Sequence, residues 1–358
     1  MSTNGRLRIM VTGGLGTVGS GLVSELQRRG CHVVSCDLVH QPDEVGFSLS
    51  SDIAEPRYAR ADVGEFRQIE RVFEKLGPFD CVYHCAAEFG RWNGEDFYET
   101  LWRTNAVGTK NVIRLQERLD FRLIHFSSSE VYGDWSEVMM EDVMDNHEIK
   151  QMNDYAMTKW VNEMQIRNSI QQYGTESVVV RLFNTYGPGE YYSPYRSVNC
   201  RFLYCALCNL PWTVFRGHVR TSTYLADTVN TLANIVDHFK PGETYNIGGN
   251  APHTIEELSE VVLKVTACDP ALVQYRDQEI LTTKTKKVDV SKAIRDLGHK
   301  DTYRLEDGML RTAEWMKEVY RFRNGHTGGR NRSRFLQNSE LDPASTEIVD
   351  EVGRRRLA

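Results

Sequence analysis

Two groups of polar residues near the middle of the chain have the types and spacing of an acid–base site. Tyr155 and Lys159 are four residues apart in a segment of helical composition, so they share one face of that helix. A lysine ammonium beside a phenol is expected to lower the tyrosine pKa from about 10 towards the range of a general base. Ser128 and Glu130 stand upstream and add a hydroxyl and a carboxylate. Together these groups suit removal of a proton from an alcohol while the alcohol is oxidised.

The elements expected around these residues place them at one edge of a sheet. The apolar run 121–126 predicts a buried strand that ends at the serines, and the run from 154 predicts a helix. In an open α/β sheet, ligands bind at the carboxyl ends of the strands. Strands and helices alternate through the first half of the chain, which predicts a doubly wound parallel α/β sheet.

A glycine-rich turn near the N-terminus predicts a dinucleotide site. A short apolar strand, 7–11, is followed by Gly13, Gly16 and Gly19 and by an amphipathic helix over 20–29. Glycines at this spacing allow a tight turn, a close approach of the backbone to a pyrophosphate and close packing of helix on strand. The helix N-terminus then faces the phosphates.

Further residues of the first half are assigned to the same cofactor site. Asp37 ends the next strand, and a carboxylate there binds ribose hydroxyls and repels a 2'-phosphate, so NAD is expected rather than NADP. Asp62 and Val63 close a third strand pattern beside the adenine. Ala86 follows a fourth strand, where small residues admit the cofactor, and Asn105 lies on a helix expected over 101–116.

Composition excludes several other classes of function. The formal net charge of -6 argues against a nucleic-acid partner. No apolar run is long enough to cross a membrane, and the first residues are too polar for a signal peptide, so a cytoplasmic protein is expected. The eight cysteines stand mostly in apolar runs and are expected to be buried and reduced. The pair Cys205 and Cys208 has no second pair, so no metal site is expected.

The motifs taken together resemble those of the extended short-chain dehydrogenase/reductases, and specifically the nucleotide-sugar epimerase/dehydratase family. The resemblance covers roughly residues 7–320. The matching segments are Thr-Gly-x-x-Gly-x-x-Gly from residue 12, His-x-Ala-Ala from 84, Ser-Ser-Ser-Glu-Val-Tyr-Gly from 127, Tyr-x-x-x-Lys from 155, Arg-Leu-Phe-Asn-Thr-Tyr-Gly-Pro from 181, Arg-Thr-Ser-Thr-Tyr from 220 and Tyr-Asn-Ile-Gly-Gly from 245.

The resemblance implies roles in sugar oxidation. Tyr155 would take the proton from the 4-hydroxyl of the sugar, and Ser128 would hydrogen-bond the same oxygen. Lys159 would also hold the nicotinamide ribose. The substrate would be a nucleotide-diphosphate sugar that becomes a 4-keto sugar, with NAD regenerated in most of these reactions.

The second half of the chain is expected to bind the nucleotide sugar. Asn184 and Arg220 match residues that contact the diphosphate in this family, and Arg220 has the planar fork that suits two phosphate oxygens. The aromatic loop 188–196, which ends at Arg196, is expected to line the same pocket. Lys286 stands where many relatives carry a second arginine, and it keeps the charge without the bidentate geometry.

The residues before Tyr132 leave three reactions open. Glu130 occupies the position of the glutamate that removes the C5 proton in 4,6-dehydratases, which is our preferred interpretation. Ser129 replaces the aspartate of the deoxythymidine-type dehydratases. The Ser129-Glu130 pair instead resembles mannose-type dehydratases and UDP-glucuronate decarboxylases, and 4-epimerisation needs the fewest extra groups. A cofactor-binding sensor without turnover is the alternative from another class, although such proteins commonly lose the tyrosine or the lysine.

The expected organisation is a Rossmann domain over 1–183, a smaller mixed α/β substrate-binding region over 184–320 with some strands returning to the sheet, and a disordered tail over 321–358. The family also implies a homodimer through a four-helix bundle of helices 108–119 and 154–171. These helices carry more apolar residues than packing against one face of the sheet requires, namely Val112, Ile113, Trp160 and Met164.

Overall fold

A computed structural model describes residues 6–39 and 57–320. Seven parallel strands form the central sheet in the order β12-β7-β5-β4-β1-β2-β3. Their bounds are β1 Arg8–Thr12, β2 His32–Asp37, β3 Tyr58–Arg60, β4 Cys81–His84, β5 Arg122–Ser128, β7 Ser177–Leu182 and β12 Thr244–Ile247. The strand order reverses direction beside β1, and the predicted doubly wound sheet is confirmed.

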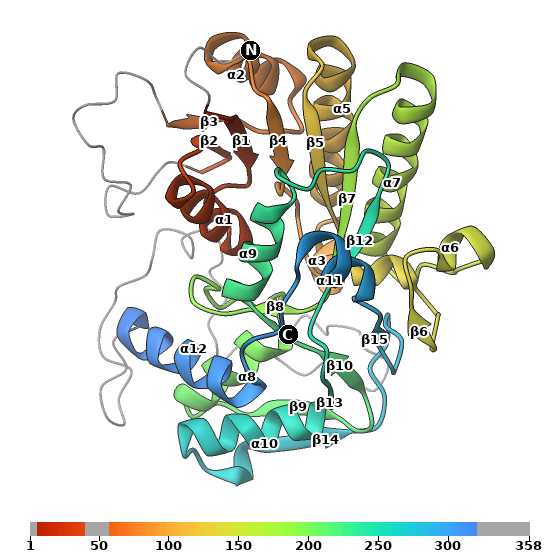
Figure 1. Cartoon of the computed structure of the whole chain (residues 1–358). Helices are drawn as coiled ribbons and strands as arrows, with labels where there is room; N and C mark the ends of the chain where they lie inside the picture. The colour runs from red at the N-terminus through yellow and green to blue at the C-terminus, as the bar shows by residue number, and fades with distance from the viewer. Residues whose placement is uncertain (1–5, 40–56, 321–358) are drawn as a thin grey trace.

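Helices cover both faces of this sheet (Figure 1). One face packs on α1 Thr17–Arg28, α9 Leu225–Asn234 and α11 Ser291–Leu297, and the other on α2 Phe66–Leu76, α5 Gly108–Leu119 and α7 Asp154–Tyr173. Side chains alternate along a strand, so Ile9 and Val11 enter one core while Met10 enters the other. The near-continuous apolar runs of the sequence are those of strands buried on both faces.

A smaller region lies at the carboxyl edge of the sheet and occupies the lower part of Figure 1. Its helices are α8 Val198–Leu207, α10 Ile255–Thr266 and α12 Leu305–Tyr320, and its strand pairs are β9 Trp212–Phe215 with β14 Val273–Arg276 and β10 Val219–Thr221 with β13 Pro252–Thr254. Thr254 and Glu257 form a capping box at the start of α10. Strand β12 of the second half pairs with β7, as expected for a strand that returns to the sheet.

Short elements complete the description. They are α3 Arg91–Asp96, α4 Tyr98–Trp102, the 3-10 helices Ser129–Tyr132 and Pro270–Leu272, β6 Val138–Met139, α6 Val143–Asn146, β8 Thr185–Tyr186, β11 Thr223–Tyr224 and β15 Lys287–Val288. Residues 101–116 are helical throughout, as expected, and a π-helical turn, Arg103–Val107, lies between α4 and α5. The expected tail, 321–358, lies outside the described residues.

The interpretation of two residues on α5 was wrong. Val112 and Ile113 are fully buried against the sheet, so neither is available to a partner. Met164 on α7 is 40% exposed, whereas Trp160 packs partly into a small cluster around Tyr132.

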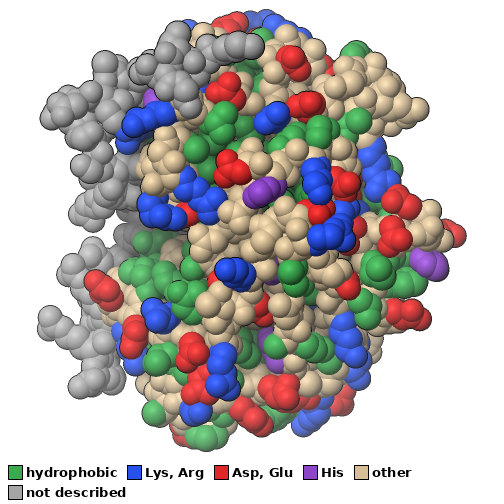
Figure 2. Space-filling view, viewed as in Figure 1, with side chains coloured by type: hydrophobic (Ala, Val, Ile, Leu, Met, Phe, Trp, Pro, Cys, Tyr) green, Lys and Arg blue, Asp and Glu red, His purple; other side chains and the backbone are tan. Residues whose placement is uncertain are grey.

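The surface carries charges of both signs. Figure 2 shows Lys and Arg side chains interspersed with Asp and Glu over the face it draws. None of the helices within 6–39 and 57–320 is both long and apolar enough to cross a membrane. Across the same ranges, no group of three or more His, Cys, Asp or Glu is arranged to hold a metal ion. All eight cysteines are free thiols.

Candidate active site

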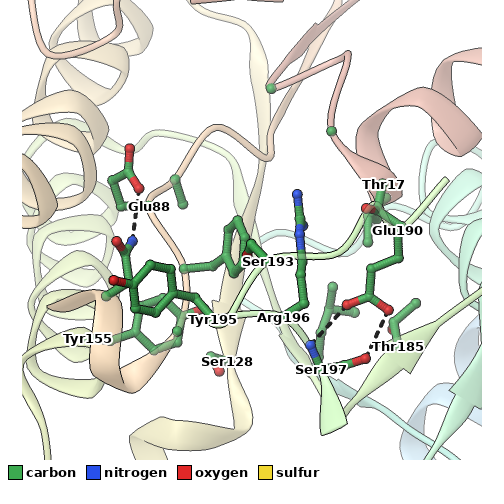
Figure 3. A pocket seen from close by; sticks show the side chains of 18 of the residues that line it. Thr17, Glu88, Ser128, Tyr155, Thr185, Glu190, Ser193, Tyr195, Arg196 and Ser197 are labelled. Carbon is green, nitrogen blue, oxygen red and sulfur yellow. Dashed lines mark hydrogen bonds between the residues drawn. The ribbon is translucent and has the colours of Figure 1, made fainter. Parts of the chain in front are cut away.

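A cavity of about 1190 Å³ runs along the carboxyl edge of the sheet, between the sheet and the smaller region. Its walls include the glycine turn after β1, the serines at the end of β5, the start of α7 and the loop that leads into α8. Figure 3 shows Ser128 and Tyr155 in this cavity together with Arg196 and Glu190 from the α8 loop. The cavity therefore joins the predicted cofactor residues to most of the predicted substrate residues.

The glycine turn has the backbone geometry of a pyrophosphate cradle. Gly13 has a φ of +68°, and a Cβ added there would lie 2.7 Å from the Ala86 nitrogen. A Cβ on Gly19 would lie 2.1 Å from the Gly13 carbonyl oxygen. Helix α1 begins just after Gly16, and no side chain caps its first N–H groups. These N–H groups face the cavity and can bind an anion, so the turn fits a dinucleotide.

The two predicted ribose and adenine carboxylates line the same end of the cavity. Asp37 accepts hydrogen bonds from the Leu15 nitrogen at 2.9 Å and the Leu38 nitrogen at 2.7 Å, which fixes its carboxylate beside the glycine turn. Asp62 accepts from the Gly64 nitrogen at 2.8 Å and pairs with Arg103 at 3.1 Å. Val63 and Ala86 also line this wall.

Asn105 is placed differently from the expectation. Its side chain is 1% exposed and does not line the cavity, because its amide is used within the protein. The Asn105 amide nitrogen donates to the Glu88 carbonyl and to Thr158, each at 3.0 Å, and its oxygen accepts from the Glu88 nitrogen at 2.8 Å. Asn105 thus ties the loop after β4 to α7, and the π-helical turn gives it the position to do so.

The acid–base residues converge as predicted. Ser128 ends β5, Tyr155 lies in the first turn of α7, and all of Ser128, Ser129, Glu130, Tyr155 and Lys159 line the cavity. A hydrogen bond with Ser128 favours the phenolate of Tyr155. The Lys159 ammonium lies 5.8 Å from the centre of the tyrosine ring and donates to the Phe126 carbonyl at 2.8 Å.

The expected lowering of the tyrosine pKa by the lysine was wrong. Burial raises the pKa of Tyr155 to about 12, and the charge of Glu130 also opposes the phenolate. Burial lowers the pKa of Lys159 to about 8. Desolvation is thus the largest influence on the pKa of each group.

A buried ion pair fixes helix α7 against the sheet. Arg181 on β7 holds both carboxylate oxygens of Glu163, at 3.0 and 2.7 Å, and Ser127 donates to Glu163 at 2.5 Å. Both charged side chains are at most 1% exposed. Glu163 is one helical turn beyond Lys159, so this network sets the position of the lysine relative to the serines.

Glu130 is held as a carboxylate. Lys286 pairs with one of its oxygens at 2.5 Å, and Asn153, the N-cap of α7, approaches the other at 3.4 Å. Burial alone would raise the pKa of Glu130, but Lys286, Arg91 and Arg220 together lower it to about 2. Glu130 is therefore charged at every physiological pH, although it is a weak base in this state.

Lys286 does not stand at the predicted place for a diphosphate contact. Its side chain is 5% exposed, it does not line the cavity, and its ammonium is engaged by Glu130. The physical reason is charge pairing: an ammonium in this buried position requires a carboxylate partner.

The other predicted substrate residues do line the cavity. Asn184 adopts a left-handed backbone conformation with a φ of +33°. The Arg196 guanidinium packs over the Phe89 ring at 4.1 Å, close to Glu190, whose carboxylate holds Ser197 (Figure 3). Arg220 donates to the carbonyls of residues 219 and 284 at 2.8 and 3.0 Å.

Several cavity residues were missed from the sequence. Arg91 at the start of α3, Arg201 on α8 and Glu279 before β15 all line the cavity near Arg220. None of them belongs to a motif, and only folding brings them together. The position of Asn153 could have been predicted, since an asparagine directly before a helix is a preferred N-cap residue.

Comparisons with known proteins identify the family of this chain. Residues 9–248 match the model of the NAD dependent epimerase/dehydratase family. A dTDP-glucose 4,6-dehydratase from Salmonella typhimurium is 27% identical over 93% of this chain and 99% of that protein. UDP-glucuronic acid decarboxylase 1 from Arabidopsis thaliana is 29% identical over 86% of this chain and 69% of that protein. The solved epimerase Mth375 from Methanothermobacter thermautotrophicus is 26% identical with a TM-score of 0.79, covering 88% of this chain and 94% of that one.

Proposed function

Because the chain belongs to the NAD-dependent epimerase/dehydratase family, we propose that it is an NDP-hexose 4,6-dehydratase that acts through a 4-keto sugar. When bound, NAD would supply the hydride chemistry at C4 of the sugar. The single observation that carries the proposal is the convergence in one cavity of Ser128, Tyr155 and Glu130 with the glycine turn.

Each residue has a role that its position supports. Gly13, Gly16 and Gly19 hold the pyrophosphate, and Asp37 holds the adenosine ribose. Tyr155 accepts the proton of the 4-hydroxyl, with Ser128 bonded to the same oxygen. Lys159 fixes the nicotinamide ribose and brings positive charge to this end of the cavity.

Glu130 then acts on the 4-keto sugar. The ketone makes the C5 proton acidic, and the Glu130 carboxylate accepts it. The carboxylic acid formed in this way gives its proton to the 6-hydroxyl, which leaves as water. Ser129 has no acidic proton to supply, so one carboxyl group serves both transfers. The 4-keto-5,6-ene that remains would receive at C6 the hydride taken from C4, and a proton from solvent at C5.

Decarboxylation of a uronic acid is the second candidate function. The low pKa of Glu130 favours it, because loss of carbon dioxide from a 4-keto uronate breaks a carbon–carbon bond and needs no base at C5. UDP-glucuronic acid decarboxylases are also among the relatives.

Transient NADH absorbance tests the shared first step. Purified protein loaded with NAD is mixed with UDP-, GDP-, dTDP- and CDP-sugars, and one of them is expected to produce NADH within a turnover. Tyr155→Phe is expected to bind NAD normally and to produce none. Biological activity that survives unchanged in Tyr155→Phe would favour a non-catalytic sensor and reject the enzyme.

A homodimer through α5 and α7 is also proposed. Met157 and Met164 are 42% and 40% exposed and stand two turns apart on one face of α7, which suits an interface. Sedimentation equilibrium is expected to show a dimer that Met164→Glu converts to a monomer. A wild-type monomer at micromolar concentration would reject it.

A cytoplasmic location is also proposed, because the eight free thiols suit a reducing compartment.

A further inference from the structure

Three arginines surround one carboxylate in the substrate half of the cavity. Arg91 pairs with Glu279 at 2.8 Å, and Arg220 approaches the other oxygen of Glu279 at 3.8 Å. Arg201 lines the same wall and contributes a further attraction to the Glu279 carboxylate. We refer to Arg91, Arg201 and Arg220 as the arginine cradle.

The cradle is largely desolvated. The side chains of Arg91, Arg220 and Glu279 are 18%, 8% and 13% exposed. Burial raises the pKa of Glu279, but the arginines outweigh it and lower the pKa, so the carboxylate is charged. Three positive charges therefore surround Glu279, with Glu130 as a weaker negative partner of Arg91 and Arg220, and all three arginines line the cavity that extends to Tyr155.

The arginines differ in how firmly they are held. Arg220 donates to two backbone carbonyls and to Thr282 at 3.3 Å, so its position does not depend on Glu279. Arg91 has Glu279 as its close partner and a longer contact of 3.4 Å with the Ile280 carbonyl. The Nε atom of Arg201 is buried without a hydrogen-bond partner. Two of the three guanidinium groups thus have donors that another anion can use.

We propose that Glu279 is a built-in counter-anion of the arginine cradle, which the diphosphate expected at Arg220 displaces. This rests on the proposed function, since it names the residues that recognise its substrate. A diphosphate carries more than one negative charge and several acceptor oxygens, so it satisfies three arginines better than one carboxylate does. Glu279 keeps these buried cations paired, because an unpaired buried charge is costly.

The displacement lowers affinity for every anion and favours the multiply charged ones. A ligand must break the Arg91–Glu279 pair before it binds, and only a strong anion gains enough to do so. Neutral sugars and single carboxylates are thereby excluded from the cradle. Removing the charge of Glu279 is expected to strengthen diphosphate binding, whereas removing the charge of Arg91 is expected to weaken it.

Calorimetry of the NAD-loaded full chain tests this proposal with UDP, GDP, CDP, dTDP and inorganic pyrophosphate as probes. Glu279→Gln keeps the size and one acceptor oxygen, and it is expected to lower the dissociation constant about tenfold, which corresponds to ~1.4 kcal/mol. Arg91→Met is expected to raise it by a similar factor. Asp277→Asn is the matched control. Asp277 lies in the same loop, its side chain is 87% exposed and pairs with Arg216, and its replacement is expected to leave binding unchanged.

The outcomes separate this inference from the proposed function. Tighter binding of pyrophosphate by Glu279→Gln in a protein that turns over no nucleotide sugar would support the cradle and reject the dehydratase. Normal sugar turnover with equal or weaker diphosphate binding by Glu279→Gln would overturn the counter-anion. Failure of wild type and Glu279→Gln alike to bind any probe would overturn it as well. Thermal unfolding of each variant checks that it is folded.

Discussion

The ion pair with Lys286 lowers the pKa of Glu130, so replacing this lysine is expected to change how the reaction depends on pH. In Lys286→Met, the carboxylate keeps its burial but loses the contact at 2.5 Å. Lys286 provides the largest attraction among the groups that lower the pKa of Glu130 to about 2. Arg91 and Arg220 remain but act from a greater distance, so burial, which raises the pKa, is expected to dominate.

The expected change follows from these contributions. Return of the Glu130 pKa at least to the ordinary carboxyl value of about 4.3 is a rise of roughly 2 units, or about 3 kcal/mol. The wild-type carboxylate remains ionised throughout the range in which the protein is assayed. In Lys286→Met, kcat/KM is expected to fall as the pH drops towards 5, because the protonated carboxyl group cannot accept the C5 proton.

The assay is a pH profile of kcat/KM with the sugar nucleotide that the protein turns over. Lys286→Arg keeps the charge and is expected to retain the wild-type acid limb. Lys287→Met, an exposed neighbour, is the matched control. An acid limb in Lys286→Met identical to that of wild type, in protein that binds NAD normally, would refute the assignment of Glu130 as the base.

Three further perturbations have defined outcomes. His125 is buried with both ring nitrogens unpartnered and its pKa is held well below the usual value, so only the unfolded chain gains its proton as pH falls below ~6.5. Stability should fall there by up to ~1.4 kcal/mol per pH unit, and urea titrations should show a smaller fall in His125→Leu. Arg181→Met leaves a buried carboxylate unpaired and should lower the free energy of unfolding by ~3–5 kcal/mol. Arg118→Met, whose side chain is 57% exposed, should lower it by at most ~1 kcal/mol. Equal losses in the two variants would contradict the stabilising role of the buried pair. Gly13→Ala should weaken NAD binding at least ~tenfold, whereas Gly242→Ala, which has a similar φ of +85° and nothing within 4 Å of the added Cβ, should not.

The sheet and the order of its elements were predictable because their signals are local. The runs 7–11 and 121–126 match β1 and β5 within a few residues, and β2 ends at Asp37 as expected. The π-helical turn before α5 was missed from the sequence, as were the hydrogen bonds of its Asn105 to a distant loop and to α7.

The charge environment of the site could not be predicted from motifs. Lys286 and Glu130 are 156 residues apart, and Arg91 and Glu279 are 188 apart. Such pairs arise from the packing of loops, for which neither spacing nor periodicity gives a signal. The pKa of Tyr155 was misjudged for a related reason: the sequence showed a nearby ammonium but not the extent of burial.

Proton NMR of the NAD-loaded protein with the same sugar nucleotides in deuterated water tests the central claim most directly. Glu130-dependent dehydration predicts a new 6-methyl signal with deuterium at C5, and its loss in Glu130→Gln. A pentose formed from a uronate, or a changed coupling pattern with no deuterium at C5, would contradict dehydration and would assign decarboxylation or epimerisation instead.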